Sequence, residues 1–119
     1  TPSWDYGARG TLLGITRGTE RSHVVRAVLE GIAHRGADLV DAAVADTDVK
    51  LAALRIDGGM SRNSTFVQAL ADVTGLPVEV APVVEATTLG AAFLAGVGIG
   101  VWNDVSDIGV LWSPAHTAT

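Results

Sequence analysis

A pair of adjacent glycines, Gly58-Gly59, is the feature that most constrains how this chain can fold. Residues 51–56 before the pair are apolar enough for a buried strand. Residues 64–74 after it repeat apolar side chains at helical spacing, and Gly75 ends that pattern. Almost no linker separates the two runs, so the backbone must turn sharply where the residues lack a Cβ. The sequence therefore predicts a strand, a tight corner and a helix in direct succession.

The corner has the chemistry of an anion site. Ser61 is a suitable N-cap for the following helix, because its hydroxyl can accept a hydrogen bond from a free N–H group of the first turn. The remaining free N–H groups and the positive end of the helix dipole favour a phosphate or a nucleotide. An ordinary tight turn between a strand and a helix explains residues 56–63 equally well, since short glycine motifs often occur by chance.

The composition excludes several classes of protein. A chain of 119 residues suits one domain, and 48% hydrophobic with 18% charged residues argues against global disorder. The net charge of −5, with Lys50 as the only lysine, argues against binding of nucleic-acid backbones. The absence of cysteine excludes disulfides, thiolate metal sites and a cysteine nucleophile. No signal peptide is visible, and we expect a cytoplasmic protein.

Three further elements flank the corner. Residues 11–15 predict a short strand, and residues 20–45 predict a long helix with one apolar stripe, capped by Thr19 or Ser22. Residues 78–81 alternate like a strand at or near the edge of a sheet.

The last third of the chain begins with an uncharged run. Residues 87–102 predict a thin, buried helix capped by Thr87 or Thr88. The run is too short and too rich in glycine for a membrane span. We expect one more helical turn at 103–108 and a frayed tail at 112–119.

The alternation of strands and helices predicts an α/β domain with parallel pairing. Ligands of such domains lie beyond the carboxyl ends of the strands, which is where the glycine corner lies. This position favours a nucleotide site over an ordinary turn. The chain lacks the GxxxxGK[ST] sequence of a P-loop, and the glycines at 96–100 follow a helix, which is the wrong context for a dinucleotide fold.

Several separated motifs, in the same order, resemble the C-terminal domain of the FGGY carbohydrate kinases, and among them the branch that phosphorylates glycerol. The family's second signature is matched by residues 10–15, 23–24 and 27–30. Further matches are residues 4–5, 8–10, 14–18, 54–59, 82–85 and 88–92. The resemblance covers residues 3–105, although sister kinases of pentuloses share many of these motifs.

The resemblance implies the actin-like ATPase superfamily, in which ATP lies between two ribonuclease-H-like domains. Residues 1–119 are then a fragment of the C-terminal, nucleotide-binding lobe, with about three strands and three to four helices, and the N-terminal lobe is absent. Nucleotide contacts are implied at Gly59 and Asn63, with Gly58 permitting the close approach. Asp57, a carboxylate at a strand end, is a tempting catalytic base, but the family's base and glycerol contacts lie in the N-terminal lobe. We therefore expect no catalytic residue and no metal ligand in this chain.

For the complete protein, the resemblance implies a kinase that binds ATP with Mg²⁺ and transfers the γ-phosphoryl group to glycerol, giving glycerol 3-phosphate. The expected partners are the N-terminal lobe of the same protein, glycerol or a similar polyol, and further copies in a homo-oligomer, but no nucleic acid and no membrane. Two alternatives stay open: a kinase of another sugar, such as the pentulose xylulose, and a non-catalytic nucleotide-binding or interaction module. The fragment alone is expected to be inactive.

Overall fold

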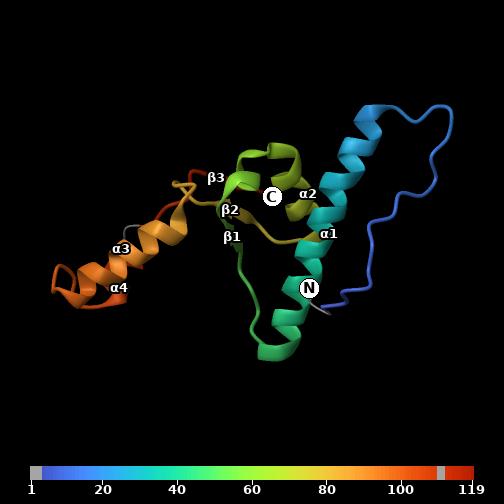
Figure 1. Ribbon diagram of the computed structural model, residues 1–119. Coiled ribbons are helices and arrows are strands. Elements are labelled where there is room, and N and C mark those ends of the chain that lie inside the picture. Colours follow the sequence, from blue (N-terminus) through green and yellow to red (C-terminus); the bar gives the residue numbers. More distant parts are fainter. Residues whose placement is uncertain (1–3, 110–111) are drawn as a thin grey trace.

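The structure is a computed structural model that describes residues 4–109 and 112–119. Within that part of the chain, four α-helices, one 3₁₀ helix and three strands confirm the predicted α/β class (Figure 1). The elements follow in the order α1 (Arg21–Thr47), β1 (Leu54–Ile56), η1 (Gly59–Arg62), α2 (Ser64–Thr74), β2 (Val78–Val80), α3 (Ala86–Gly98), α4 (Val105–Gly109) and β3 (His116–Ala118).

The predicted long helix is confirmed as α1, but its start differs from the prediction. Neither Thr19 nor Ser22 is the N-cap; that position is held by Glu20. The Glu20 N–H donates to Nδ1 of His23, 3.0 Å away. The Thr19 hydroxyl is engaged elsewhere, since it accepts from the Thr16 N–H at 2.9 Å. The first turn is therefore closed by a histidine three residues into the helix, a partner that the preference of caps for small polar residues does not predict.

The sheet has the order β1-β2-β3. Strands β1 and β2 pair in parallel, as predicted, with Leu54 opposite Val78. Strand β3 pairs antiparallel to β2, with Ala118 opposite Val78. Two predictions are wrong here: β2 is the central strand, and residues 116–118 of the expected frayed tail form a strand. A three-residue strand at a chain end carries almost no periodic signal of its own, so only its partner reveals it.

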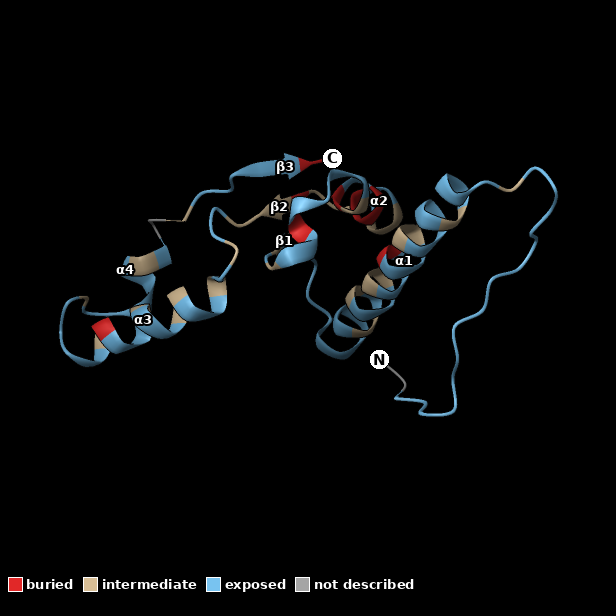
Figure 2. Cartoon of the chain, turned by 45° about the horizontal axis from the view of Figure 1, so that its top comes forward, coloured by how far each residue is buried: buried red, intermediate tan, exposed pale blue. Residues whose placement is uncertain are grey.

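The core lies where α2 packs between α1 and the sheet. Its buried members are Ala33, Val67, Ala69, Leu70, Ala71, Val78 and Ala118. Figure 2 shows that the buried positions concentrate on α2, with a single one on α1. The two helices approach closely at Gly36, where an added Cβ would lie 2.8 Å from Cδ1 of Leu70. As predicted, α2 ends at Gly75, which adopts the left-handed conformation with φ of 65°.

The strand predicted at residues 11–15 is absent, and residues 4–20 run as an extended loop away from the core (Figure 1). Leu13 is 95% exposed there. Gly14 adopts a φ of 81°, which interrupts an extended conformation. A strand is stabilised by pairing with a neighbour, and residues 11–15 have none in the described part of the chain.

Helix α3 is confirmed, but it is not buried. It packs on α4 and on Trp102, and together these elements form an arm that projects from the sheet (Figure 1). Its N-cap is Glu85, without a side-chain hydrogen bond, so the predicted caps Thr87 and Thr88 are wrong. The predicted helical turn at 103–108 is confirmed by α4. Among the described residues, no helix combines the length and the apolar character needed to cross a membrane.

The arm and the N-terminal loop make the molecule elongated. Its extents are 62 × 29 × 26 Å. The radius of gyration is 17.8 Å, whereas a compact domain of this length has about 13.5 Å. Large apolar side chains are exposed at both ends, among them Tyr6 and Ile99. The chain therefore holds a small core with unpartnered apolar surface around it.

Candidate functional site

The glycine corner lies at the carboxyl end of β1, and its first glycine is required by the backbone. Gly58 has φ of 83° and ψ of −178°, a conformation that is essentially restricted to glycine. Its N–H donates to the Val84 carbonyl at 3.1 Å. The corner is thereby tied to the loop that precedes α3.

A short 3₁₀ helix, η1, separates the glycines from α2, and this changes which residue caps that helix. Ser61 is not the N-cap: it is buried, and its hydroxyl donates to the Gly58 carbonyl at 2.7 Å. Asn63 caps α2 instead, because its Oδ1 accepts from the Phe66 N–H at 3.1 Å. The serine therefore stabilises the corner from inside, and the N-cap lies two residues later than predicted, while α2 spans the predicted residues 64–74.

Gly59 has an open face. An ideal Cβ at this position would meet no atom within 4 Å, and the φ angle is not in the left-handed region. Neither packing within the described chain nor backbone conformation therefore requires a glycine here. The lack of a side chain keeps the space beside the Gly59 backbone free, and a flat ligand could approach it closely.

Asn63 is exposed, and its side-chain amide is only half used. The oxygen is engaged by the cap, while the described residues offer no hydrogen-bond partner to the NH₂ group. An amide has two donors on that nitrogen. The structure thus brings Gly58, Gly59 and Asn63, the three residues singled out from the sequence, together around one 3₁₀ turn.

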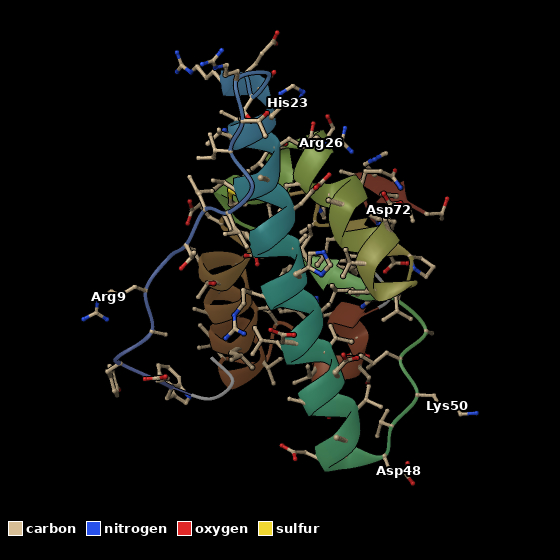
Figure 3. All side chains as sticks on the ribbon, turned by 90° about the vertical axis from the view of Figure 1, so that its right-hand side faces the viewer. Arg9, His23, Arg26, Asp48, Lys50 and Asp72 are labelled. Atoms are coloured by element: carbon tan, nitrogen blue, oxygen red, sulfur yellow. The ribbon has the colours of Figure 1, made fainter. Side chains whose placement is uncertain are left out.

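Asp57 is exposed just before the glycine pair and forms no ion pair within the described ranges. In the part of the chain that the structure describes, no group of three or more His, Asp or Glu side chains could hold a metal. Lys50 precedes β1, whereas the corner follows it, so the only lysine lies at the opposite end of that strand. Figure 3 shows Lys50 at the far end of α1 from His23.

Sequence reasoning did not predict two cavities that lie outside the glycine corner. One, of about 360 Å³, is mostly apolar and is bounded by residues of α3 and α4, by Trp112 and by Arg55 of β1. The Arg55 guanidinium lies 3.8 Å from the centroid of the Trp112 ring and 3.0 Å from the Glu79 carboxylate. The sequence indicated β1 only by its apolar residues, and Trp112 lay in the tail that we expected to be frayed. No local pattern therefore predicted that Arg55 and Trp112 are in contact.

The second cavity is an open hollow of about 540 Å³ between the starts of α1 and α2, lined in part by Arg21, Arg26 and Thr65. The Arg26 guanidinium donates to the Glu30 carboxylate at 2.6 Å, and this hydrogen bond raises the pKa of Arg26 above its ordinary value. The negative charge of Asp72 on α2 contributes to the same shift of the pKa (Figure 3). Arg26 thus remains charged and is paired with Glu30 at the surface.

Comparison with known proteins gives consistent results. Residues 1–99 match the FGGY family of carbohydrate kinases, C-terminal domain. The chain is 50% identical over 111 residues to "Glycerol kinase 2" of Thermotoga maritima, covering 93% of this chain and 22% of that protein. It is 46% identical over 112 residues to the glycerol kinase of Thermoanaerobacter sp., covering 94% and 22%. The chain therefore spans less than a quarter of the length of these relatives.

Solved structures agree with the sequence matches. The glycerol kinase of Plasmodium falciparum, solved with ADP, superposes with a TM-score of 0.83 at 39% identity, covering 98% of this chain and 24% of that one. The gluconate kinase of Lactobacillus acidophilus gives 0.83 at 30% identity, with the same coverage. The xylulose kinase of the same organism gives 0.78 at 31% identity, again with that coverage.

Proposed function

This chain belongs to the FGGY family of carbohydrate kinases, whose members have the actin-like ATPase fold, and we propose that it is part of the C-terminal, nucleotide-binding lobe of an ATP-dependent glycerol kinase. The observation that carries the proposal is the 50% identity to glycerol kinases over nearly the whole chain. The complete enzyme transfers the γ-phosphoryl group of ATP to glycerol and releases ADP and glycerol 3-phosphate. The geometry of the glycine corner supports the role of this part in binding the nucleotide.

The adenine nucleotide lies against the open face of Gly59. Gly58 turns the backbone, and Gly59, without a side chain, lets the nucleoside approach the main chain. Asn63 donates from its free NH₂ group to the base or the ribose, while its oxygen continues to cap α2. The N-terminal end of α2 adds the positive end of a helix dipole to the same region.

The chemical step belongs to the complete protein. Phosphoryl transfer depends on holding the nucleophile, the metal and the γ-phosphate in line, and on neutralising the phosphate charge. We assign no general base to this chain, because the resemblance implies that the base lies in the N-terminal lobe. We assign no Mg²⁺ ligand either, because the described residues hold no group of three or more His, Asp or Glu side chains that could bind a metal. The N-terminal lobe supplies these groups and closes on the nucleotide. We further propose that the enzyme works in the cytoplasm as a homo-oligomer.

Two other functions are weaker candidates. A kinase of another sugar is supported by the likeness to gluconate and xylulose kinases, but their identities of 30% and 31% are below the 39% for the glycerol kinase of known structure. A non-catalytic nucleotide-binding module would use the same corner without an N-terminal lobe.

The test is an ADP-release assay with the complete protein, Mg²⁺-ATP and separate additions of glycerol, xylulose and gluconate. We expect turnover that depends on glycerol. Gly59→Val, which fills the open face, should raise the KM for ATP with little effect on the KM for glycerol. Gly31→Val is the matched control, because Gly31 also has no atom within 4 Å of an added Cβ but lies in the middle of α1. A preference for xylulose or gluconate would contradict the glycerol assignment, and no turnover with any sugar would favour the non-catalytic module.

A further inference from the structure

Arg62, at the glycine corner, carries a positive charge that no contact within the described residues engages. Arg62 is the last Lys or Arg of the sequence, and no other follows it up to residue 119. It is exposed and forms neither an ion pair nor a side-chain hydrogen bond with the residues that the structure describes. The cation nearest in sequence, Arg55, is instead engaged by Glu79 and Trp112.

The 3₁₀ geometry of η1 fixes the direction in which Arg62 leaves the turn. The Ser61 N–H donates to the Gly58 carbonyl at 3.2 Å, and the Asn63 N–H donates to the Met60 carbonyl at 3.0 Å, the i to i+3 pattern of a 3₁₀ helix. In such a helix, side chains three residues apart eclipse each other, and the rise is about 2 Å per residue. Arg62 therefore projects from the same side as the open face of Gly59, roughly 6 Å along the axis.

The other two sides of η1 are taken by Ser61 and Met60. Ser61 faces the interior, where its hydroxyl bonds to the Gly58 carbonyl. Met60 occupies the remaining exposed side. Arg62 alone among the side chains of η1 shares the direction of Gly59, and an extended arginine side chain is long enough to turn back over the space beside the glycine.

We propose that Arg62 is a nucleotide-positioning residue whose guanidinium lies against the face of the adenine base held at the glycine corner. The proposal rests on the proposed function, since it needs the nucleoside to occupy the open face of Gly59. A guanidinium is planar and can lie flat on an aromatic face, whereas the compact ammonium of lysine makes a cation–π contact without this stacking. Gly59 limits the base on one side by its backbone, and Arg62 covers it from the next turn.

The experiment measures the binding of ADP and of adenosine to the complete protein by calorimetry, for the wild type, Arg62→Ala, Arg62→Lys and Arg35→Ala. Arg35 is the control, because it is an exposed arginine of α1 that pairs with Asp38 and lies outside the corner. Loss of a cation–π contact predicts that Arg62→Ala weakens both ligands by roughly three- to thirtyfold. Arg62→Lys should recover only part of this loss, because an ammonium keeps a cation–π contact but cannot stack on the base. Arg35→Ala should bind both ligands like the wild type. The KM for ATP should rise in Arg62→Ala while kcat and the KM for glycerol stay unchanged.

Three results would overturn the proposal. If Arg62→Ala binds both ligands like the wild type, Arg62 has no role, and the proposed function stands without it. If Arg62→Ala weakens the binding of ADP but not of adenosine, and Arg62→Lys restores it, the residue contacts phosphate and not the base. If the wild type binds neither ligand, the proposed function fails together with this inference.

Discussion

The two glycines of the corner have different physical reasons to be glycine. At Gly58 the reason is the backbone, since φ is 83° with ψ near 180°. At Gly59 the backbone is ordinary, and the reason we propose is the nucleotide. The family resemblance already implied a nucleotide contact at Gly59 and a supporting role for Gly58. The backbone conformation that requires a glycine at Gly58 could not be predicted, because it depends on dihedral angles that only the structure gives.

Substitution by alanine should separate them. Gly58→Ala forces a side chain into a glycine-only conformation, and we expect it to destabilise the protein by about 1–3 kcal/mol. Gly59→Ala should leave the melting temperature unchanged and weaken ADP binding. Thermal melting and calorimetry of the two variants of the complete protein check this. Equal stability of both variants would show that the strain at Gly58 is relieved elsewhere.

Asn63 has two tasks that a single atom change can separate. Asn63→Asp keeps an oxygen that can accept from the Phe66 N–H, but loses both NH₂ donors. We expect unchanged stability, with ADP affinity lowered by roughly two- to tenfold for one lost hydrogen bond.

Asn63→Ala is the companion variant, because it removes the cap as well and should cost about 1 kcal/mol of stability. Chemical denaturation measures the stability of both variants, and calorimetry measures their affinity for ADP. If Asn63→Asp binds ADP as tightly as the wild type, the amide does not touch the nucleotide.

Among the helices and strands, the sequence predicted correctly those that depend on residues close together in the chain. Helices α1 and α2 and strand β1 follow from apolar periodicity, and Gly75 marks where α2 ends. The prediction failed for residues 11–15 and for β3, because a strand depends on a partner that lies far away in sequence. The predicted caps were also wrong, since η1 moves the N-cap of α2 from Ser61 to Asn63. The three candidate residues still lie together, because they fall within one turn, and their role in binding remains a proposal.

The arm formed by α3 and α4 depends on one close contact. Gly96 is buried under Trp102, and an added Cβ would overlap Cζ3 of that ring. The ring also meets Phe93 edge to face, with the centroids 5.4 Å apart. Gly96→Ala must displace the indole, and we expect a loss of about 1–3 kcal/mol. Near-ultraviolet circular dichroism detects the displacement of the indole, and thermal melting measures the loss of stability.

Gly98→Ala is the matched control for this prediction, because it lies in the same helix and an added Cβ there meets nothing within 4 Å. It should melt like the wild type. Identical near-ultraviolet spectra for Gly96→Ala and Gly98→Ala would mean that Trp102 does not rest on Gly96.

Many large apolar side chains of the molecule are exposed. Leu13 and Tyr6 are 95% and 86% exposed. Strand β1 pairs only with β2 among the described strands, so one of its edges is free. Free edges beside apolar surface tend to pair with other chains. We propose that the rest of the longer protein covers these surfaces.

The isolated chain should therefore self-associate or be only marginally stable. Light scattering and thermal melting of the purified chain test this directly. A monodisperse monomer with a cooperative transition above about 65 °C would show that the exposed surfaces need no cover.

The isolated chain should also be unable to transfer phosphate. It offers one lysine, distant from the corner, and the described residues hold no carboxylate cluster for a metal. Half of a cleft leaves the phosphates in water, where each charge contact is weak. The check is ADP release by the purified chain with Mg²⁺-ATP and glycerol. Glycerol-dependent turnover that disappears in Asp57→Asn would contradict it and would make Asp57 the base.

The most direct test of the central claim, that this corner binds the nucleotide of a glycerol kinase, is a crystal structure of the complete protein with ADP and glycerol. We predict that the nucleoside lies against the open face of Gly59, with the Asn63 NH₂ group within hydrogen-bonding distance of the base or the ribose. An ordered ADP bound elsewhere, with the face of Gly59 left to solvent or covered by protein, would contradict the account.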